Sequence, residues 1–135
     1  RLYERAAADE EKGVHFLAQA FFRVGQYEKV QEIARLGLTR YPKSAALMFD
    51  VGLSYFLMQQ AKEALPYFAA AIALDPRYLN AYIYRQQAWE FLGNRPAAKA
   101  DVEVVKALKQ SGSYTQDSFA LHANMDLILV RYQLK

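Results

Sequence analysis

Cysteine is absent from the 135-residue sequence, which excludes disulfide bonds and thiolate chemistry. The two histidines, His15 and His122, lie near opposite ends of the chain, and neither has a carboxylate or thiol constellation around it. No HExxH motif, no GxSxG motif and no Gly-rich phosphate loop occurs. The sequence therefore predicts a protein that is not an enzyme and that has no cofactor or metal.

Long apolar runs and clustered charge are missing as well. No apolar run reaches the roughly 18 residues of a membrane-spanning helix, so we expect no membrane insertion. The net charge is +3, and basic residues are mixed with acidic ones along the chain, so we expect no nucleic-acid surface. This composition fits a soluble protein of the bacterial cytoplasm or periplasm and does not choose between the two compartments.

Apolar residues, in contrast, are abundant. They make up 53% of the sequence and include ten Tyr and eight Phe, enough for one domain with a continuous core. The chain opens on Arg1, with neither a Met nor an apolar leader, and we interpret it as an excised or processed fragment.

A spaced pattern of large, small and proline residues runs through residues 45–76. It follows the scheme W-x2-L-G-x2-Y…A-x3-F…P, with Met in place of the Trp and Val in place of the Leu. The residues that carry it are Met48, Val51, Gly52, Tyr55, Ala64, Phe68 and Pro76.

The same pattern returns at a spacing of 34 residues, which is the mark of an internal repeat. Tyr55 corresponds in this way to Phe21 and Trp89, which are also large aromatics. Before the turn inside each repeat, Gly25 and Gly93 take corresponding positions, and Gln59 stands at that point in the middle copy.

On these residues the chain resembles the tetratricopeptide repeat family, over about three quarters of its length. The resemblance implies an all-α fold, a right-handed α-α superhelix of three helix-turn-helix repeats with a C-terminal capping helix. We place the repeats at residues 11–44, 45–78 and 79–112 and the last helix at residues 113–135. Residues 1–10 are either an N-terminal helical extension or the end of an upstream repeat.

Local signals agree with this layout. Met48, Gly52 and Tyr55 fall on one helical face, and small residues such as Gly52 let neighbouring helices approach closely. Ser44 is a suitable N-cap for the helix that follows it. Pro66 lies inside the second helix of the middle repeat, so we expect a late start or a mild kink there.

The last segment has the capping-box spacing of Ser113 and Gln116, which predicts a helix from Tyr114 to about Leu134. This helix has two apolar stripes, and one of them should pack on the second helix of the third repeat. The other stripe is a candidate surface for self-association, as a homodimer through the C-terminal helix. It contains Leu121, Met125, Ile128 and Tyr132.

In this family the first helix of each repeat lines a concave groove, and the resemblance implies that ligands bind there. The first helix of the middle repeat is apolar nearly all round. Its second apolar face therefore either lies in the groove or is covered by other parts of the chain. The groove positions are His15, Gln19, Phe22, Phe49, Leu53, Phe56, Leu57, Asn80, Ile83, Gln87, Glu90 and Phe91. They predict an apolar floor with amides and charges toward its ends, which suits a peptide.

One subtype of the family is disfavoured. Members that grip the acidic C-terminus of heat-shock chaperones use a clamp of Lys, Asn, Asn, Lys and Arg. The corresponding positions here hold His15, Gln19, Asp50, Asn80 and Tyr84, which supply no lysine or arginine and place a carboxylate where it would repel another.

We therefore predict a non-enzymatic protein-protein interaction module, of the adaptor, assembly or chaperone-like kind, that binds a peptide segment of a partner in its groove. The three-repeat layout also resembles the bacterial chaperones of type III secretion translocators. The alternative is a structural role, as a segment of a longer repeat array or a scaffold that self-associates through its terminal helices.

Overall fold

The computed structural model describes residues 2–115, and it describes side-chain environments from residue 10 onward. All regular structure in this part of the chain is helical, apart from an isolated bridge between Tyr78 and Thr115. The helices are α1 (Leu2–Arg23), α2 (Tyr27–Arg40), α3 (Ala45–Leu57), α4 (Ala61–Leu74), α5 (Leu79–Phe91) and α6 (Arg95–Ser111).

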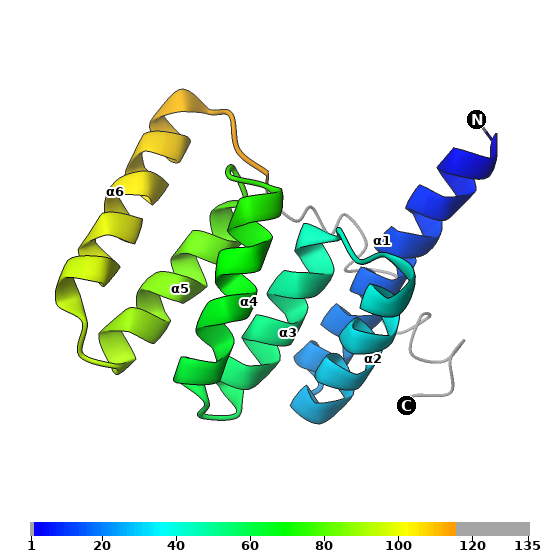
Figure 1. Ribbon diagram of the computed structural model, residues 1–135, viewed down its shortest axis with the longest axis horizontal. Coiled ribbons are helices and arrows are strands. Elements are labelled where there is room, and N and C mark those ends of the chain that lie inside the picture. Colours follow the sequence, from blue (N-terminus) through cyan, green and yellow to red (C-terminus); the bar gives the residue numbers. More distant parts are fainter. Residues whose placement is uncertain (1, 116–135) are drawn as a thin grey trace.

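The six helices form three antiparallel hairpins, α1–α2, α3–α4 and α5–α6, which follow one another along the long axis of the molecule (Figure 1). Each hairpin packs on the next through the α2–α3 and α4–α5 contacts. The all-α solenoid predicted from the repeat is confirmed. Helix α1 runs without interruption through residue 11, so residues 2–10 are its opening turns.

The turn inside each hairpin has the same geometry in all three copies. Gly25, Gln59 and Gly93 have left-handed backbones, with φ of 80°, 67° and 81°. In each copy the amide of the following residue donates to the carbonyl of the aromatic five positions before it, at 2.8–3.0 Å. These aromatics are Phe21, Tyr55 and Trp89, which the 34-residue spacing places at corresponding positions. Of these three residues, only Gln59 has a side chain, and it adopts the left-handed backbone conformation that normally favours glycine.

Helix starts agree with the sequence at one position and differ at another. The Ser44 hydroxyl accepts from the Leu47 amide at 3.2 Å, which confirms the predicted N-cap of α3. The expected late start around Pro66 is wrong, because α4 begins at Ala61 and contains Pro66 in its second turn. Proline has no amide hydrogen to donate to the carbonyl of Lys62, and both residues lie on the exposed side of α4.

Helices α3 and α4 approach each other closely at Gly52. A Cβ atom on Gly52 would lie 2.8 Å from the ring of Phe68, which is fully buried. Ala64 and Ala71, also fully buried, supply the small residues of α4 in the same core cluster. The glycine of the repeat pattern is therefore fixed by packing against the phenylalanine of the same pattern.

Arg85 occupies a position where the middle repeat has the apolar Val51. The structure explains this departure by a charge pair between α5 and α6. The Arg85 guanidinium donates twice to the buried carboxylate of Asp101, at 2.9 and 2.7 Å. The hydrogen bond with Asp101 raises the pKa of Arg85 above its usual value, so the guanidinium stays charged.

Gly52→Ala should lower the free energy of unfolding by about 1–3 kcal/mol, because the added methyl group must displace a buried ring. Gly13→Ala is the matched control, since Gly13 lies in α1 with no atom within 4 Å of its added Cβ. That change should stabilise the protein by up to about 1 kcal/mol. Urea unfolding of both variants measures the difference, and equal effects would contradict this packing.

Candidate functional site

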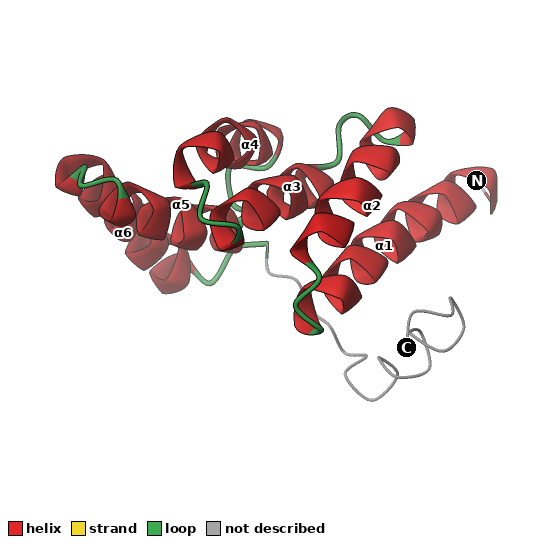
Figure 2. Cartoon of the chain, turned by 90° about the horizontal axis from the view of Figure 1, so that it is seen from below, coloured by secondary structure: helices red, strands yellow, loops and turns green. Residues whose placement is uncertain are grey.

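The candidate site is the face formed by the first helices of the three hairpins. Helices α1, α3 and α5 lie in one layer, and α2 and α4 lie in the other (Figure 2). Helix α3 contacts both α1 and α5 directly, so the three helices form a continuous surface. Two groups of side chains join them, a polar group between α1 and α3 and an aromatic group between α3 and α5.

The polar group is built around the carboxylate of Asp50, which is fully buried. His15 bonds to one of its oxygens through Nδ1 at 2.5 Å, and the Gln19 amide donates to the other at 2.7 Å. Two of the predicted groove residues, His15 and Gln19, therefore hold α1 to α3, and both are buried.

The aromatic group is centred on Phe49 of α3. Its ring lies 5.9 Å from that of Phe68, 5.3 Å from that of Tyr78 and 5.6 Å from that of Tyr84. Phe49 is only 2% exposed, and the nearby Leu53 is 1% exposed. Such pairs contribute about 0.5–1.5 kcal/mol each beyond the area that they bury.

The prediction that Phe49 and Leu53 form the floor of an open groove therefore needs correction, because both side chains lie inside the core. The sequence left two alternatives for the second apolar face of α3, exposure in the groove or burial, and these two residues are buried. The rings of Tyr78 and Tyr84 pack on Phe49, and neither residue is among the predicted groove positions.

Three other predicted groove residues come together at one end of this face. Phe56 and Leu57 at the end of α3 and Phe91 at the end of α5 line a cavity of about 180 Å³. Gln59 and Ala61, from the turn and the start of α4, complete its wall. Phe91 is 66% exposed, more than any other large apolar residue in the described part of the chain.

The remaining predicted positions are more dispersed. Phe22 is half-buried and packs against two clusters of core residues. One cluster contains Phe49 and Phe68, and the other contains Phe21 and Val30. Asn80 and Ile83 are half-buried, whereas Gln87 and Glu90 are exposed. Glu90 lines a different cavity of about 560 Å³, which lies between α5 and α6. The candidate self-association residues Leu121, Met125, Ile128 and Tyr132 lie outside the described residues.

The end of α6 also differs from the sequence prediction. Tyr114 and Thr115 are not helical, because the backbone of Thr115 pairs with that of Arg77 and Leu79. Ser113 does not begin a helix, and its hydroxyl accepts from Arg77 at 3.0 Å instead. The rest of the predicted last helix lies outside the described residues.

The described residues were also compared with the requirements of a membrane span and of a metal site. None of the described helices is long and apolar enough to cross a membrane. Between residues 2 and 115 no three His, Asp or Glu side chains gather in a way that could hold a metal ion.

Known structures resemble this chain closely in fold, although no protein-family model matches the sequence. The second tetratricopeptide domain of Spaghetti (RPAP3), bound to the HSP90 peptide SRMEEVD, is 29% identical, with a TM-score of 0.70 over 77% of this chain and 98% of that one. The second such domain of human RPAP3, with the HSP70 peptide SGPTIEEVD, is 27% identical, with a TM-score of 0.68 over 97% and 98% of the two chains.

A third similar structure is that of SycD, the type III secretion translocator chaperone of Yersinia enterocolitica. It is 14% identical, with a TM-score of 0.71 over 93% of each chain, and this likeness concerns the fold alone. The repeat geometry and these neighbours agree, and the chain has the fold of the tetratricopeptide repeat domains.

Asp50→Ala should lower the free energy of unfolding by about 3–5 kcal/mol, because it leaves the buried polar groups of His15 and Gln19 without the carboxyl group that they bond. The control is Glu103→Ala, since Glu103 is exposed and forms only a surface ion pair with Lys106 at 3.8 Å. That change should stay within about 0.5 kcal/mol. Urea unfolding at neutral pH measures both, and a loss below about 1 kcal/mol for Asp50→Ala would contradict a structural role.

Proposed function

We propose that this protein is a non-enzymatic protein-interaction module that binds a peptide segment of a partner at the Phe56–Leu57–Phe91 end of its α1–α3–α5 face. The observation that carries this proposal is the exposure of Phe91 beside an apolar cavity. A large aromatic side chain that remains in water next to a cavity is typical of a contact site. The peptide complexes of the similar domains support the same class of function.

The chemistry of the face favours an apolar anchor over an acidic one. Asp50 and Tyr84 stand at two of the positions that the acidic-peptide clamp uses in other members of the family. The Asp50 carboxylate is enclosed by its hydrogen bonds with His15 and Gln19, and the Tyr84 ring packs on Phe49 and Phe56. We therefore propose a ligand segment with one or two apolar side chains, and not an acidic peptide such as the SRMEEVD and SGPTIEEVD peptides of the similar domains.

The size of the cavity suits a single anchor. A volume of about 180 Å³ accommodates roughly one large apolar side chain. Burying such a side chain contributes about 1.5–3 kcal/mol. Further contacts along the half-buried and exposed positions of α5, such as Ile83 and Gln87, would supply the rest of a moderate affinity.

The structural alternative has a specific observation in its favour at the other end of the molecule. Helix α2 is covered by α3, and α4 is covered by α5, whereas in the described chain no further helix covers α6. The cavity between α5 and α6 is lined in part by Ala98 and Val102. A following repeat would pack at this position, as it does in longer arrays.

Phe91→Ala should weaken peptide binding about tenfold or more, because it removes one wall of the anchor cavity. The probe is a phage-displayed library of 15-residue peptides, followed by titration of the enriched peptides by fluorescence anisotropy. Leu36→Ala is the control, since Leu36 is similarly exposed, at 60%, but lies on α2. It should leave the affinity within about twofold.

Enriched peptides should contain a large apolar residue whose replacement by Ala also weakens binding. Failure to enrich any peptide, or an equal loss of affinity in the Phe91 and Leu36 variants, would contradict the proposed site. Selection of peptides that end in acidic residues would contradict the proposed ligand chemistry.

A further inference from the structure

The outer side of the first hairpin carries an open apolar patch. Its most exposed member is Leu36 of α2, which has 60% of its surface in water. Beside it lies a cavity of about 210 Å³ between α1 and α2, whose apolar walls include Val14, Leu17 and Ile33. All three are only half-buried. These four residues form what we call the α1–α2 patch.

The middle repeat shows how this surface is covered elsewhere in the stack. Leu17 and Ile33 correspond, at the 34-residue spacing, to Val51 and Tyr67. Val51 is fully buried, and the Tyr67 ring lies 5.4 Å from the guanidinium of Arg35, which belongs to the preceding hairpin. Among the described helices, α1 and α2 contact only each other and α3, so no helix takes that place on the first hairpin. The α1–α2 patch is therefore a packing surface of the repeat that remains uncovered in the described chain.

The opposite end of the stack has a different character. The outer side of α6 carries Lys99 and Lys106, which are both exposed. At the 34-residue spacing these lysines correspond to Leu65 and Ile72 of α4, which pack against the core. A head-to-tail contact between two molecules would press the α1–α2 patch against these charges and remove them from water, which is unfavourable. The two ends of the molecule are therefore not complementary to each other.

The α1–α2 patch is complementary to itself, because a projecting side chain stands next to a hollow. The cavity has room for roughly one large apolar side chain, and Leu36 is such a side chain. Around a two-fold axis, each Leu36 can enter the cavity of the other copy. Glu10 and Arg40, which also line the cavity, form an ion pair at 2.7 Å. This pair gives the rim one charge of each sign, so the rim can face its own copy without net repulsion.

From these observations we propose that the α1–α2 patch is the interface of a symmetric dimer, in which a second copy of this chain covers the first hairpin. The inference goes beyond the proposed function and does not depend on it, since the Phe56–Leu57–Phe91 cavity lies on the other two hairpins. It also concerns a different surface from the apolar stripe predicted in the C-terminal segment. Such a dimer presents one anchor cavity on each copy, and a partner with two anchors would bind it with avidity.

Sedimentation velocity on the full chain, over about a hundredfold range of concentration, tests whether the dimer forms. The mass should rise from that of one chain, 15.4 kDa, toward twice this value. Leu36→Glu should raise the dissociation constant of the dimer at least about tenfold, because each copy would place a carboxylate in an apolar cavity. Leu74→Glu is the matched control, since Leu74 is also exposed, at 41%, but lies on α4 of the second hairpin. It should leave the constant within about twofold.

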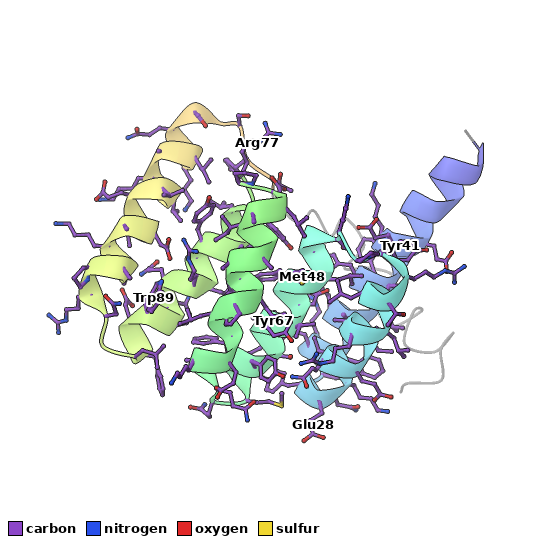
Figure 3. The ribbon with its side chains drawn as sticks, in the orientation of Figure 1. Glu28, Tyr41, Met48, Tyr67, Arg77 and Trp89 are labelled. Carbon is purple, nitrogen blue, oxygen red and sulfur yellow. The ribbon has the colours of Figure 1, made fainter. Side chains whose placement is uncertain are left out.

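Single spin labels then report how the two copies are arranged. Because the chain has no cysteine, a label at Glu28→Cys on α2 or at Lys106→Cys on α6 occurs once per copy, and every measured distance joins two copies. Both residues are exposed, and Glu28 lies at the opposite end of α2 from Tyr41, which lines the cavity (Figure 3). Double electron–electron resonance should give a distance at least about 20 Å shorter for the Glu28 label, since the first hairpins meet and the third hairpins lie far apart.

Several results would overturn the inference. These are the mass of one chain at every concentration, a dimer that Leu36→Glu leaves unchanged, and an equal loss of affinity in the Leu36 and Leu74 variants. Equal distances for the two labels would indicate a head-to-tail contact, and a shorter distance for the Lys106 label would indicate a contact through α6; either result also overturns the inference. None of these outcomes depends on whether a partner peptide binds, so failure of the dimer and failure of the peptide site are distinguishable.

Discussion

The packing of the Phe49 ring is the interaction on which the rest of the structure depends. This one side chain of α3 contacts Phe68 from α4, Tyr78 from the following turn and Tyr84 from α5. It therefore joins the second hairpin internally and also joins it to the third. A hairpin cannot bury its apolar face alone, and Phe49 is the point at which the neighbouring hairpin covers that face. Through Tyr78 it also connects the core to the site where Thr115 is held.

The same packing determines which part of the α1–α3–α5 face is available to a ligand. At the centre, Phe49 and Leu53 are enclosed, and Asp50 is enclosed with His15 and Gln19 toward α1. At the ends of α3 and α5 the enclosure stops, and Phe56, Leu57 and Phe91 surround a cavity. These contacts support the proposed anchor site at one end of the face rather than an apolar floor along its whole length.

The repeat is the part of the structure that the sequence predicts well, because local geometry recurs with the spacing. The 34-residue period predicts three equivalent turns, and Gly25, Gln59 and Gly93 have equivalent backbones. The burial of the second apolar face of α3 could not be predicted in this way, since it depends on which rings of the next hairpin reach Phe49. The pairing of Thr115 after α6 was also missed, because its hydrogen bonds to residues 36 to 38 positions earlier leave no periodic signal.

The most direct test of this account compares the stabilities of Phe49→Ala and Phe91→Ala by urea unfolding. If Phe49 joins the hairpins and Phe91 is a free anchor wall, Phe49→Ala should lose about 3–5 kcal/mol. Phe91→Ala, from which an exposed side chain is removed, should change by less than about 0.5 kcal/mol. Similar small losses in both variants would contradict the account, because Phe49 would then be a groove residue rather than the centre of the core.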